Sequence, residues 1–423
     1  MTWNVTEITE KTPLLRIRAF RLMFTTRMAS HTANQFLAIA IAWEIRKITD
    51  SALHLGLVGL AQFLPPLVFS LLAGQIADRY DRRIILRISF LIQSITIVAF
   101  LVLTAIPDPP LATIYTLITL NAVARGFEGP ALQALLPAMV PRVVLGRAIA
   151  MQSTVNKISQ LAAPPVAGIL LAAFGTSIDY LACLIFTLAA LWAMLMMPEP
   201  LTPFKPSKGG LNEVLDGFRF IWRSPPILGA ISLDLVATFF GGVAALLPIF
   251  ADEILGIGEI GFGFLRSAPG VGGILTALVL ARYPIQRGAG KMLFVTMAVY
   301  GAATLGFGLS EHVVLSFILL VVVGGSDMVN TVVRQTFVQV NTPDEMRGRV
   351  AAVSSVSVMT GSQLGQFRAG VGADWFGAVG SVVIGGAIVV VLVGVWAGLF
   401  PSLRNMQKPD EVQDVHRQAA KPN

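Results

Sequence analysis

Apolar segments long enough to cross a lipid bilayer follow one another along almost the whole chain, with only short polar links between them. Backbone N–H and C=O groups in lipid must be hydrogen-bonded within a helix or a closed β-barrel. The segments here are near-continuous in apolar residues and lack the alternation of barrel strands. Only 13% of the residues are charged, about half the share found in soluble proteins. We therefore expect an all-α membrane protein.

Twelve transmembrane helices are expected. They lie at roughly 20–44, 52–77, 84–106, 111–138, 146–173, 178–197, 226–251, 259–283, 291–309, 313–338, 349–374 and 380–400. The longest polar link, rich in proline and glycine, divides them six and six. We expect an N-terminal six-helix half at 1–197, a cytoplasmic central linker at 198–225, a C-terminal half at 226–402 and a cytoplasmic tail at 403–423.

The polar links alternate in charge along the chain. One set carries most of the basic residues, for example Arg347 and Arg349, whereas the other carries mainly acids, for example Asp252 and Glu253. Lys and Arg are retained on the cytoplasmic side of a membrane. Both termini are thus expected in the cytoplasm. The net charge of +7 follows from these links, so no nucleic-acid partner is expected.

The second half of the sequence repeats part of the first. An offset of 202 pairs Gln133 with Gln335, and further prolines, glycines and arginines pair at the same offset without a gap. These pairs are Pro141 with Pro343, Gly146 with Gly348, Arg147 with Arg349, Gly168 with Gly370, and Phe174 and Gly175 with Phe376 and Gly377. The two halves are therefore expected to be parallel repeats.

The link between the second and third expected spans carries a glycine, an acid and a basic cluster at fixed spacing. Its residues are Gly74, Asp78, Arg79, Arg82 and Arg83. This pattern resembles the Gly-x-x-x-Asp-Arg-x-x-Arg-Arg loop of the major facilitator superfamily. The resemblance implies two parallel six-helix halves and gives these five residues the role of a conformational latch.

Within the superfamily, the stretch 334–350 is the more selective one. It contains the pair Thr342–Pro343 and the run Arg347–Val350. It is similar to the bacterial branch of the superfamily that contains the enterobactin exporter and related drug exporters, most of them proton-coupled. The resemblance implies a monomeric secondary transporter in the bacterial inner membrane. It would export small amphipathic molecules by alternating access, with protons as the coupling ion and the lipid bilayer as its surroundings.

Other functions remain open at this point. Span five keeps only Pro165 and Gly168 of the antiporter signature found in related exporters. Uptake, lysophospholipid flipping and a non-transporting membrane sensor are the alternatives. No enzymatic activity, cofactor or metal site is expected, because no nucleophile–base pair or ligand cluster appears in the sequence.

Polar residues inside the expected spans fall on single helical faces. An ionisable residue at membrane depth costs at least ~2.5–3.5 kcal/mol and usually faces a cavity or a partner. Candidates in spans one, four, seven and ten are Arg27, His31, Asn34, Arg125, Glu128, Asp234, Asp327, Asn330 and Arg334. In the superfamily these four spans line the central cavity, so we expect these residues along the substrate or proton pathway.

Asp234 is the favoured proton carrier among these candidates. No basic residue lies near it in the sequence, whereas Glu128 and Asp327 have arginines nearby that would keep them ionised. We also expect Asp327 to pair with Arg125, because the two occupy equivalent positions in the repeat.

The charge pattern predicts a cytoplasmic C-terminus, and a reporter fused after Gln407 tests it. A fluorescent protein that folds only in the cytoplasm should be active there, whereas alkaline phosphatase should be inactive. Phosphatase activity at this position would overturn both the orientation and the even number of spans.

The latch motif predicts that Asp78→Asn impairs transport while expression and membrane insertion stay close to normal. Asp78 is expected to approach the N-terminus of span eleven near Arg349, where free amides favour an anion, in the outward-open state only. Transport per inserted protein molecule is the measurement. Normal turnover in this variant would reject the latch.

Overall fold

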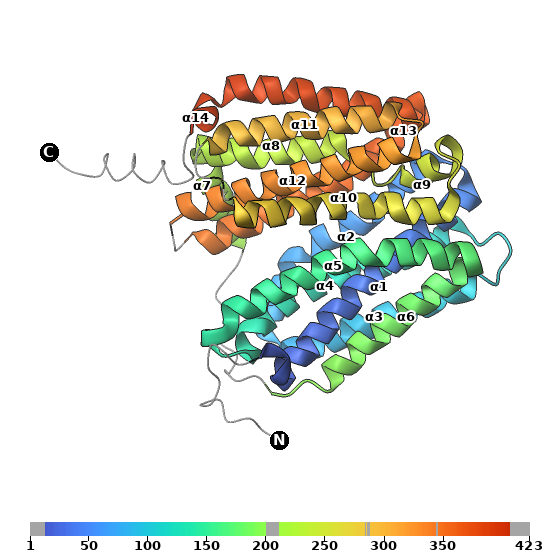
Figure 1. Cartoon of the computed structure of the whole chain (residues 1–423). Helices are drawn as coiled ribbons and strands as arrows, with labels where there is room; N and C mark the ends of the chain where they lie inside the picture. Colours follow the sequence, from blue (N-terminus) through green and yellow to red (C-terminus); the bar gives the residue numbers. More distant parts are fainter. Residues whose placement is uncertain (1–12, 200–210, 284, 286–287, 344–345, 407–423) are drawn as a thin grey trace. The chain divides into compact units, whose positions relative to one another are not determined.

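The computed structural model describes residues 13–199, 211–283, 285, 288–343 and 346–406, except for the side chains of 70–79, 142 and 211–214. The described chain is built of helices and contains no strand (Figure 1). By their contacts the residues form two units, Met1–Ile48 with Ala61–Gly209 and Thr49–Leu60 with Gly210–Asn423. Each unit is considered separately below.

Six long helices carry the first six expected spans. They are α1 (Arg18–Thr49), α2 (Ala52–Arg79), α3 (Arg82–Leu103), α4 (Leu111–Met139), α5 (Arg142–Phe174) and α6 (Thr176–Leu195). A short 3-10 helix, Leu14–Arg16, precedes them. The core of the first unit packs around side chains such as Phe20, Met23 and Phe90, each fully buried.

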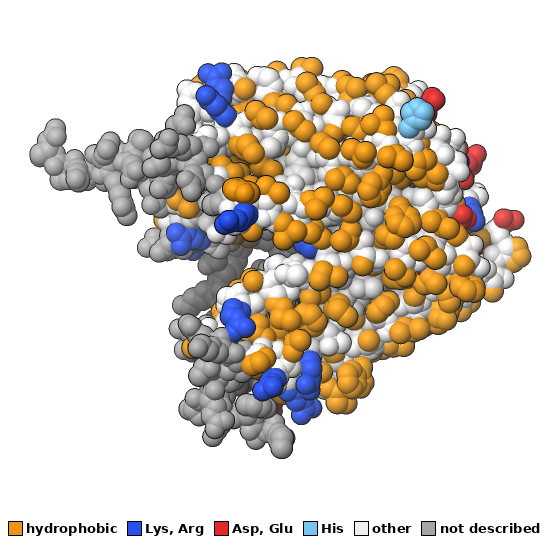
Figure 2. Space-filling view, viewed as in Figure 1, with side chains coloured by type: hydrophobic (Ala, Val, Ile, Leu, Met, Phe, Trp, Pro, Cys, Tyr) orange, Lys and Arg blue, Asp and Glu red, His pale blue; other side chains and the backbone are white. Residues whose placement is uncertain are grey.

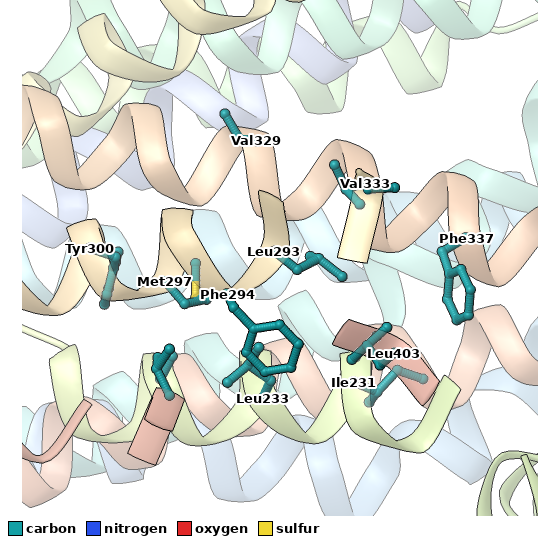
Figure 3. Packing of buried hydrophobic residues seen from close by; sticks show 14 of the residues in the cluster. Ile231, Leu233, Leu293, Phe294, Met297, Tyr300, Val329, Val333, Phe337 and Leu403 are labelled. Carbon is teal, nitrogen blue, oxygen red and sulfur yellow. The ribbon is translucent and has the colours of Figure 1, made fainter. Parts of the chain in front are cut away.

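The remaining expected spans fall on helices of the second unit. These are α8 (Pro225–Gly241), α10 (Gly258–Arg282), α11 (Ala289–Leu309), α12 (Val313–Asn341) and α13 (Arg347–Leu399), with short α9 (Leu247–Ile249), a π-helix (Phe250–Ile254) and α14 (Pro401–Arg404). Ile231 and Leu233 of α8 lie in one cluster with Phe294 of α11 and Phe337 of α12 (Figure 3).

Eight of the described helices are long and apolar enough to cross a membrane, or up to nine if α7 (Leu211–Arg223) and α8, which are bent against each other, count as one span. The twelve expected spans are consistent with this result, because α13 alone covers two of them. The expected span 226–251 differs, since α8 ends at Gly241 and non-helical residues precede α9. Two adjacent glycines, Gly241 and Gly242, weaken the helix at that point.

The sequence repeat recurs in the backbone. Gly377 interrupts α13 with a φ of 72° and a ψ of 164°, and Gly175 joins α5 to α6 with a φ of 79° and a ψ of −178°. Positive φ favours glycine because a Cβ would clash with the backbone. The same residue in the same conformation therefore connects the last two expected spans of each half.

A helix not expected from the sequence, α7 (Leu211–Arg223), lies within the predicted linker. Its described part is bent by 107° from α8. Ile221 is 3% exposed, whereas Phe218 and Trp222 are 51% and 65% exposed. A Cβ at Gly217 would lie 2.8 Å from the carbonyl oxygen of Arg349. The helix thus packs one face on the start of α13. The predicted half and linker boundaries themselves stay a prediction.

Charged side chains gather at the ends of the helices and leave an apolar belt between them. On the second unit, Figure 2 shows Lys and Arg near the end that carries α7 and α14, and acidic side chains at the opposite end. This is the distribution that the alternating polar links predict.

Close packing of α10 on α12 predicts opposite effects for two neighbouring glycines. A Cβ at Gly272 would overlap the carbonyl oxygen of Val321, whereas a Cβ at Gly273 would meet only the Gly324 oxygen at 3.9 Å. Gly272→Ala should therefore cost about 1–3 kcal/mol through overpacking. Gly273→Ala should be neutral or stabilising, because it removes the helix-interior glycine cost of roughly 0.5–1 kcal/mol.

The measurement is the melting temperature of the purified protein in detergent, followed by fluorescence-detected size exclusion. Gly273→Ala is the matched control, one residue away with the same change in volume. Equal melting temperatures for the two variants would contradict the tight contact between these helices.

Candidate functional site

A buried carboxyl group lies at the centre of the polar cluster in the first unit. Glu128 of α4 is 8% exposed, and the Ser30 hydroxyl of α1 donates a hydrogen bond to its Oε1. Gln93 of α3 donates its Nε2–H to Oε2 at 3.3 Å. Beside it, Asn121 donates to Thr96 Oγ1 at 2.9 Å. Donors from two helices, α1 and α3, thus hold the Glu128 carboxyl group, and Arg27 and Arg125 also act on it electrostatically.

Two arginines of this unit donate to neutral amide oxygens. Arg125 of α4 donates to Asn34 Oδ1 of α1, and Arg27 Nε donates to Asn156 Oδ1 of α5 at 3.4 Å. His31 lies on the same face of α1 as Arg27 and Asn34 and is half-buried. The structure therefore brings the predicted residues of spans one and four together across the α1–α4 contact.

The second unit contains a buried ion pair. Asp234 of α8 and Arg334 of α12 are each 3% exposed, and Arg334 Nη2 lies 3.6 Å from Asp234 Oδ2. Asn330 donates its Nδ2–H to Asp234 Oδ1 at 2.5 Å, and Arg334 Nη1 donates to Ser354 Oγ of α13 at 2.8 Å. Among the described residues, Asn330 Oδ1 and Arg334 Nε have no hydrogen-bond partner.

This pair corrects the reason for favouring Asp234. No basic residue is near Asp234 along the chain, but α12 places the Arg334 guanidinium group beside it. Asn330, one turn before Arg334 on α12, donates a hydrogen bond to the same carboxylate. Sequence spacing on a single helix cannot reveal a partner that a packed neighbour supplies. Asp327 is half-buried on the same helix, α12. Its expected pairing with Arg125 would join the two units and stays a prediction.

The basic residues that open α3 bind carbonyl oxygens at the ends of neighbouring helices. Arg82 Nη1 donates to the Ala134 oxygen at 2.7 Å, and Arg83 Nη1 donates to the Pro198 oxygen at 3.2 Å. Arg83 also forms an ion pair with Asp81 at 2.8 Å. Asp81 caps α3 by accepting the Arg83 backbone N–H, and these hydrogen bonds hold its pKa below its usual range. Arg83 thus covers a carbonyl group beyond the end of α6, and Arg82 binds one near the end of α4.

The rest of the latch motif cannot be placed. Gly74, Asp78 and Arg79 lie in the last part of α2, whose side chains are outside the described residues. Arg349, the expected neighbour of Asp78, lies 3.4 Å from Asp216 Oδ2 of α7. The latch therefore remains a prediction, and α7 supplies an acid that sequence reasoning did not associate with Arg349.

Charged residues that the sequence analysis did not select also lie within the spans. Arg368 of α13 donates to the Ser381 carbonyl oxygen at 3.4 Å and lies 6.0 Å from the centre of the Phe240 ring. Asp179 of α6 is fully buried, and Arg266 of α10 is half-buried. Each is an ionisable residue inside an apolar run. The criterion that identifies the other candidates in the sequence therefore applies to these residues as well.

In the described part of the chain, no group of three or more His, Cys, Asp or Glu side chains is arranged to hold a metal ion. Cys183 is a buried free thiol whose Sγ–H donates to the Ala33 carbonyl oxygen at 3.2 Å. What the geometry offers instead is two sets of buried polar groups, one in each unit, built on the helices that were expected to line a pathway.

Solved structures of transporters share this fold. The chain superposes on a bacterial homologue of the human lysosomal transporter Spinster in an inward-facing, unoccupied conformation, with a TM-score of 0.71 and 15% identity, over 93% of this chain and 99% of that one. A bacterial homologue of the iron transporter ferroportin, also inward-facing, gives a TM-score of 0.68 and 16% identity, over 91% and 100% of the two chains. At such low identities these likenesses show the major facilitator fold alone.

Sequence comparison is more specific. The enterobactin exporter EntS of Escherichia coli O1:K1 is 28% identical over 353 residues, which cover 82% of this chain and 83% of that protein. EntS of Shigella boydii serotype 18 is 29% identical over the same shares. The family model described as transmembrane secretion effector, MFS_3, matches residues 9–421. The chain therefore belongs to the transmembrane secretion effector family of major facilitator transporters.

Proposed function

We propose that this transporter exports small amphipathic molecules across the bacterial inner membrane by alternating access, driven by the proton gradient. The similarity to EntS supports export, because those relatives are named enterobactin exporters. The observation that carries proton coupling is the buried pair of Asp234 with Arg334. The alternatives are uptake, lysophospholipid flipping and sensing without transport. A transport measurement that detects no export would favour one of them.

A buried carboxylate can stay ionised only while a partner compensates its charge. In the described conformation Asp234 has two partners on α12, Asn330 and Arg334. Any movement of α12 against α8 that withdraws the Arg334 guanidinium leaves the carboxylate without a counter-charge. It then takes up a proton and releases it when Arg334 returns. The pair is thus a switch between a proton and an arginine, and it ties protonation to helix position.

The remaining candidates have distinct roles in this proposal. Arg27, His31, Asn34 and Arg125 line the substrate pathway from the first unit. Glu128, which accepts hydrogen bonds from Ser30 and Gln93, is the second choice for a proton carrier. Asp327 lies near Asn330 on α12 and contributes to the pathway from the second unit. In the latch, Gly74, Asp78, Arg79, Arg82 and Arg83 bias the equilibrium between the two faces.

Proteoliposomes with a defined pH gradient test both parts of the proposal. Wild-type protein should accumulate an amphipathic fluorescent substrate against its concentration gradient only when the pH gradient is present. Asp234→Asn should lose this accumulation but still bind substrate, because the amide cannot release a proton. Asp252→Asn, which removes an exposed carboxylate from the same unit, is the matched control and should behave as wild type.

A purely structural role for Asp234 predicts a different pattern. Removing one partner of a buried ion pair costs about 3–5 kcal/mol, whereas replacing both costs far less. The double variant Asp234→Asn with Arg334→Gln therefore regains thermal stability. If that stable double variant also regained proton-driven accumulation, or if Asp234→Asn alone transported normally, Asp234 would not be the carrier and Glu128 would be tested next.

A further inference from the structure

Arg266 is a cation inside α10 to which no residue that the structure describes supplies a counter-charge. No hydrogen bond or ion pair joins its side chain to any other residue that the structure describes, and its Nε is buried without a partner. Burial is the one influence on its charge that comes from the described residues, and no charged side chain among them acts on it. Placing an arginine at membrane depth costs at least ~2.5–3.5 kcal/mol even where it can reach water or a partner. Because no described partner offsets this cost, the charge of Arg266 calls for a binding partner from outside the chain.

The position of Arg266 excludes contact with lipid. At about 100° per residue, Arg266 lies about 180–200° around α10 from Leu275 and Phe264. Those two side chains are 55% and 45% exposed and mark the outward face of the helix. Arg266 instead shares a face with Phe262 and Gly270, both buried. Its guanidinium group is therefore directed to the interior side of α10.

Depth along the helix excludes a simple escape to the membrane surface. Arg266 follows the first residue of α10, Gly258, by eight positions, or about 12 Å along the helix axis. Toward the other end, Arg282 lies sixteen positions further on, in the last turn. The side chain keeps partial exposure although Nε itself is closed off. The accessible part is thus the outer end of the guanidinium group.

Other arginines in the spans have partners that Arg266 lacks. Arg27 and Arg125 donate to neutral amide oxygens, and Arg368 donates to a backbone carbonyl and lies over an aromatic ring. By contrast, Arg334 has a carboxylate partner. The Glu128 carboxylate also acts electrostatically on Arg27 and Arg125, so those two cations have a counter-charge nearby. Arg266 thus differs from Arg27, Arg125 and Arg334 in that no described carboxylate acts on it.

We infer that Arg266 binds an anionic group of the transported molecule, a carboxylate, phosphate or phenolate, and that this transporter is selective for acidic amphipathic substrates. The inference rests on the proposed transport function and specifies the substrate class. Arg is suited to the task because its planar fork binds two oxygens of such a group at once. An acidic substrate supplies the counter-charge that the helix lacks, so binding and charge compensation are the same event.

Ligand-induced stabilisation of the purified, detergent-solubilised protein tests the site without requiring transport. A ligand that binds the folded protein raises its melting temperature. The probes are 1-naphthoate and 1-naphthyl phosphate, with uncharged 1-naphthalenemethanol as the matched alcohol. The two anions should stabilise the wild-type protein, and the alcohol should not. Arg266→Gln should weaken anion binding about tenfold or more, as expected for a lost charge-assisted hydrogen bond. Arg266→Lys should retain part of it.

Arg282→Gln is the matched control, because it removes one positive charge from the exposed end of the same helix and should bind the anions as wild type does. The melting temperature without ligand gives a second readout. Arg266→Gln should melt at the same or a higher temperature, because an uncompensated charge is removed from the interior. A clear fall would reveal a structural partner and overturn the inference.

Equal stabilisation by anions and alcohol in the wild type would also overturn it, as would unchanged anion binding in Arg266→Gln. The proposed transport function fails by a different result. If wild-type proteoliposomes move neither the anions nor the alcohol while the anions still stabilise the protein through Arg266, transport is rejected and the anion site stands.

Discussion

Inside a membrane a charge must be compensated by the protein itself, and this constraint shapes most of what the structure shows. Backbone groups satisfy it by forming helices, so the described chain is helical throughout its spans. Side chains satisfy it in different ways in the two units. In the first, Ser30 and Gln93 donate hydrogen bonds to the buried Glu128 carboxyl group, and Arg27 and Arg125 act on it electrostatically, whereas in the second Arg334 forms an ion pair with Asp234. Asp234 thus depends on a close counter-charge that a helix movement can withdraw.

How much of this can be read from sequence depends on where the information lies. Apolar run length and link charge place nearly all of the spans, because both properties are local. The repeat at offset 202 predicts equivalent turns, and Gly175 and Gly377 have matching backbone angles. The partner of Asp234 is not local: it depends on α12 packing against α8, and no spacing within either helix encodes that. The early end of α8 at Gly241 and the helix α7 likewise depend on tertiary contacts, such as the packing of Gly217 on Arg349.

Charged residues also lie outside the spans that are expected to line a cavity. Arg266 and Arg368 lie in spans eight and eleven. The physical criterion, an ionisable group in an apolar run, applies equally to every span. In the structure, the residue that says most about the substrate is the one whose charge no described residue compensates. A cation in that position says more about what the transporter carries than the satisfied pairs, since those are complete without a substrate.

The single glycines at 175 and 377 have a mechanical consequence. Each connects two long helices through one residue in a conformation that favours glycine. Because each turn depends on one residue, a side chain at either position would strain it and change the angle between the helical segments that it joins. Trp375, 73% exposed beside Gly377, is of a type enriched at membrane–water interfaces. A single pair of backbone torsions therefore sets the angle between the last two helical segments of each half.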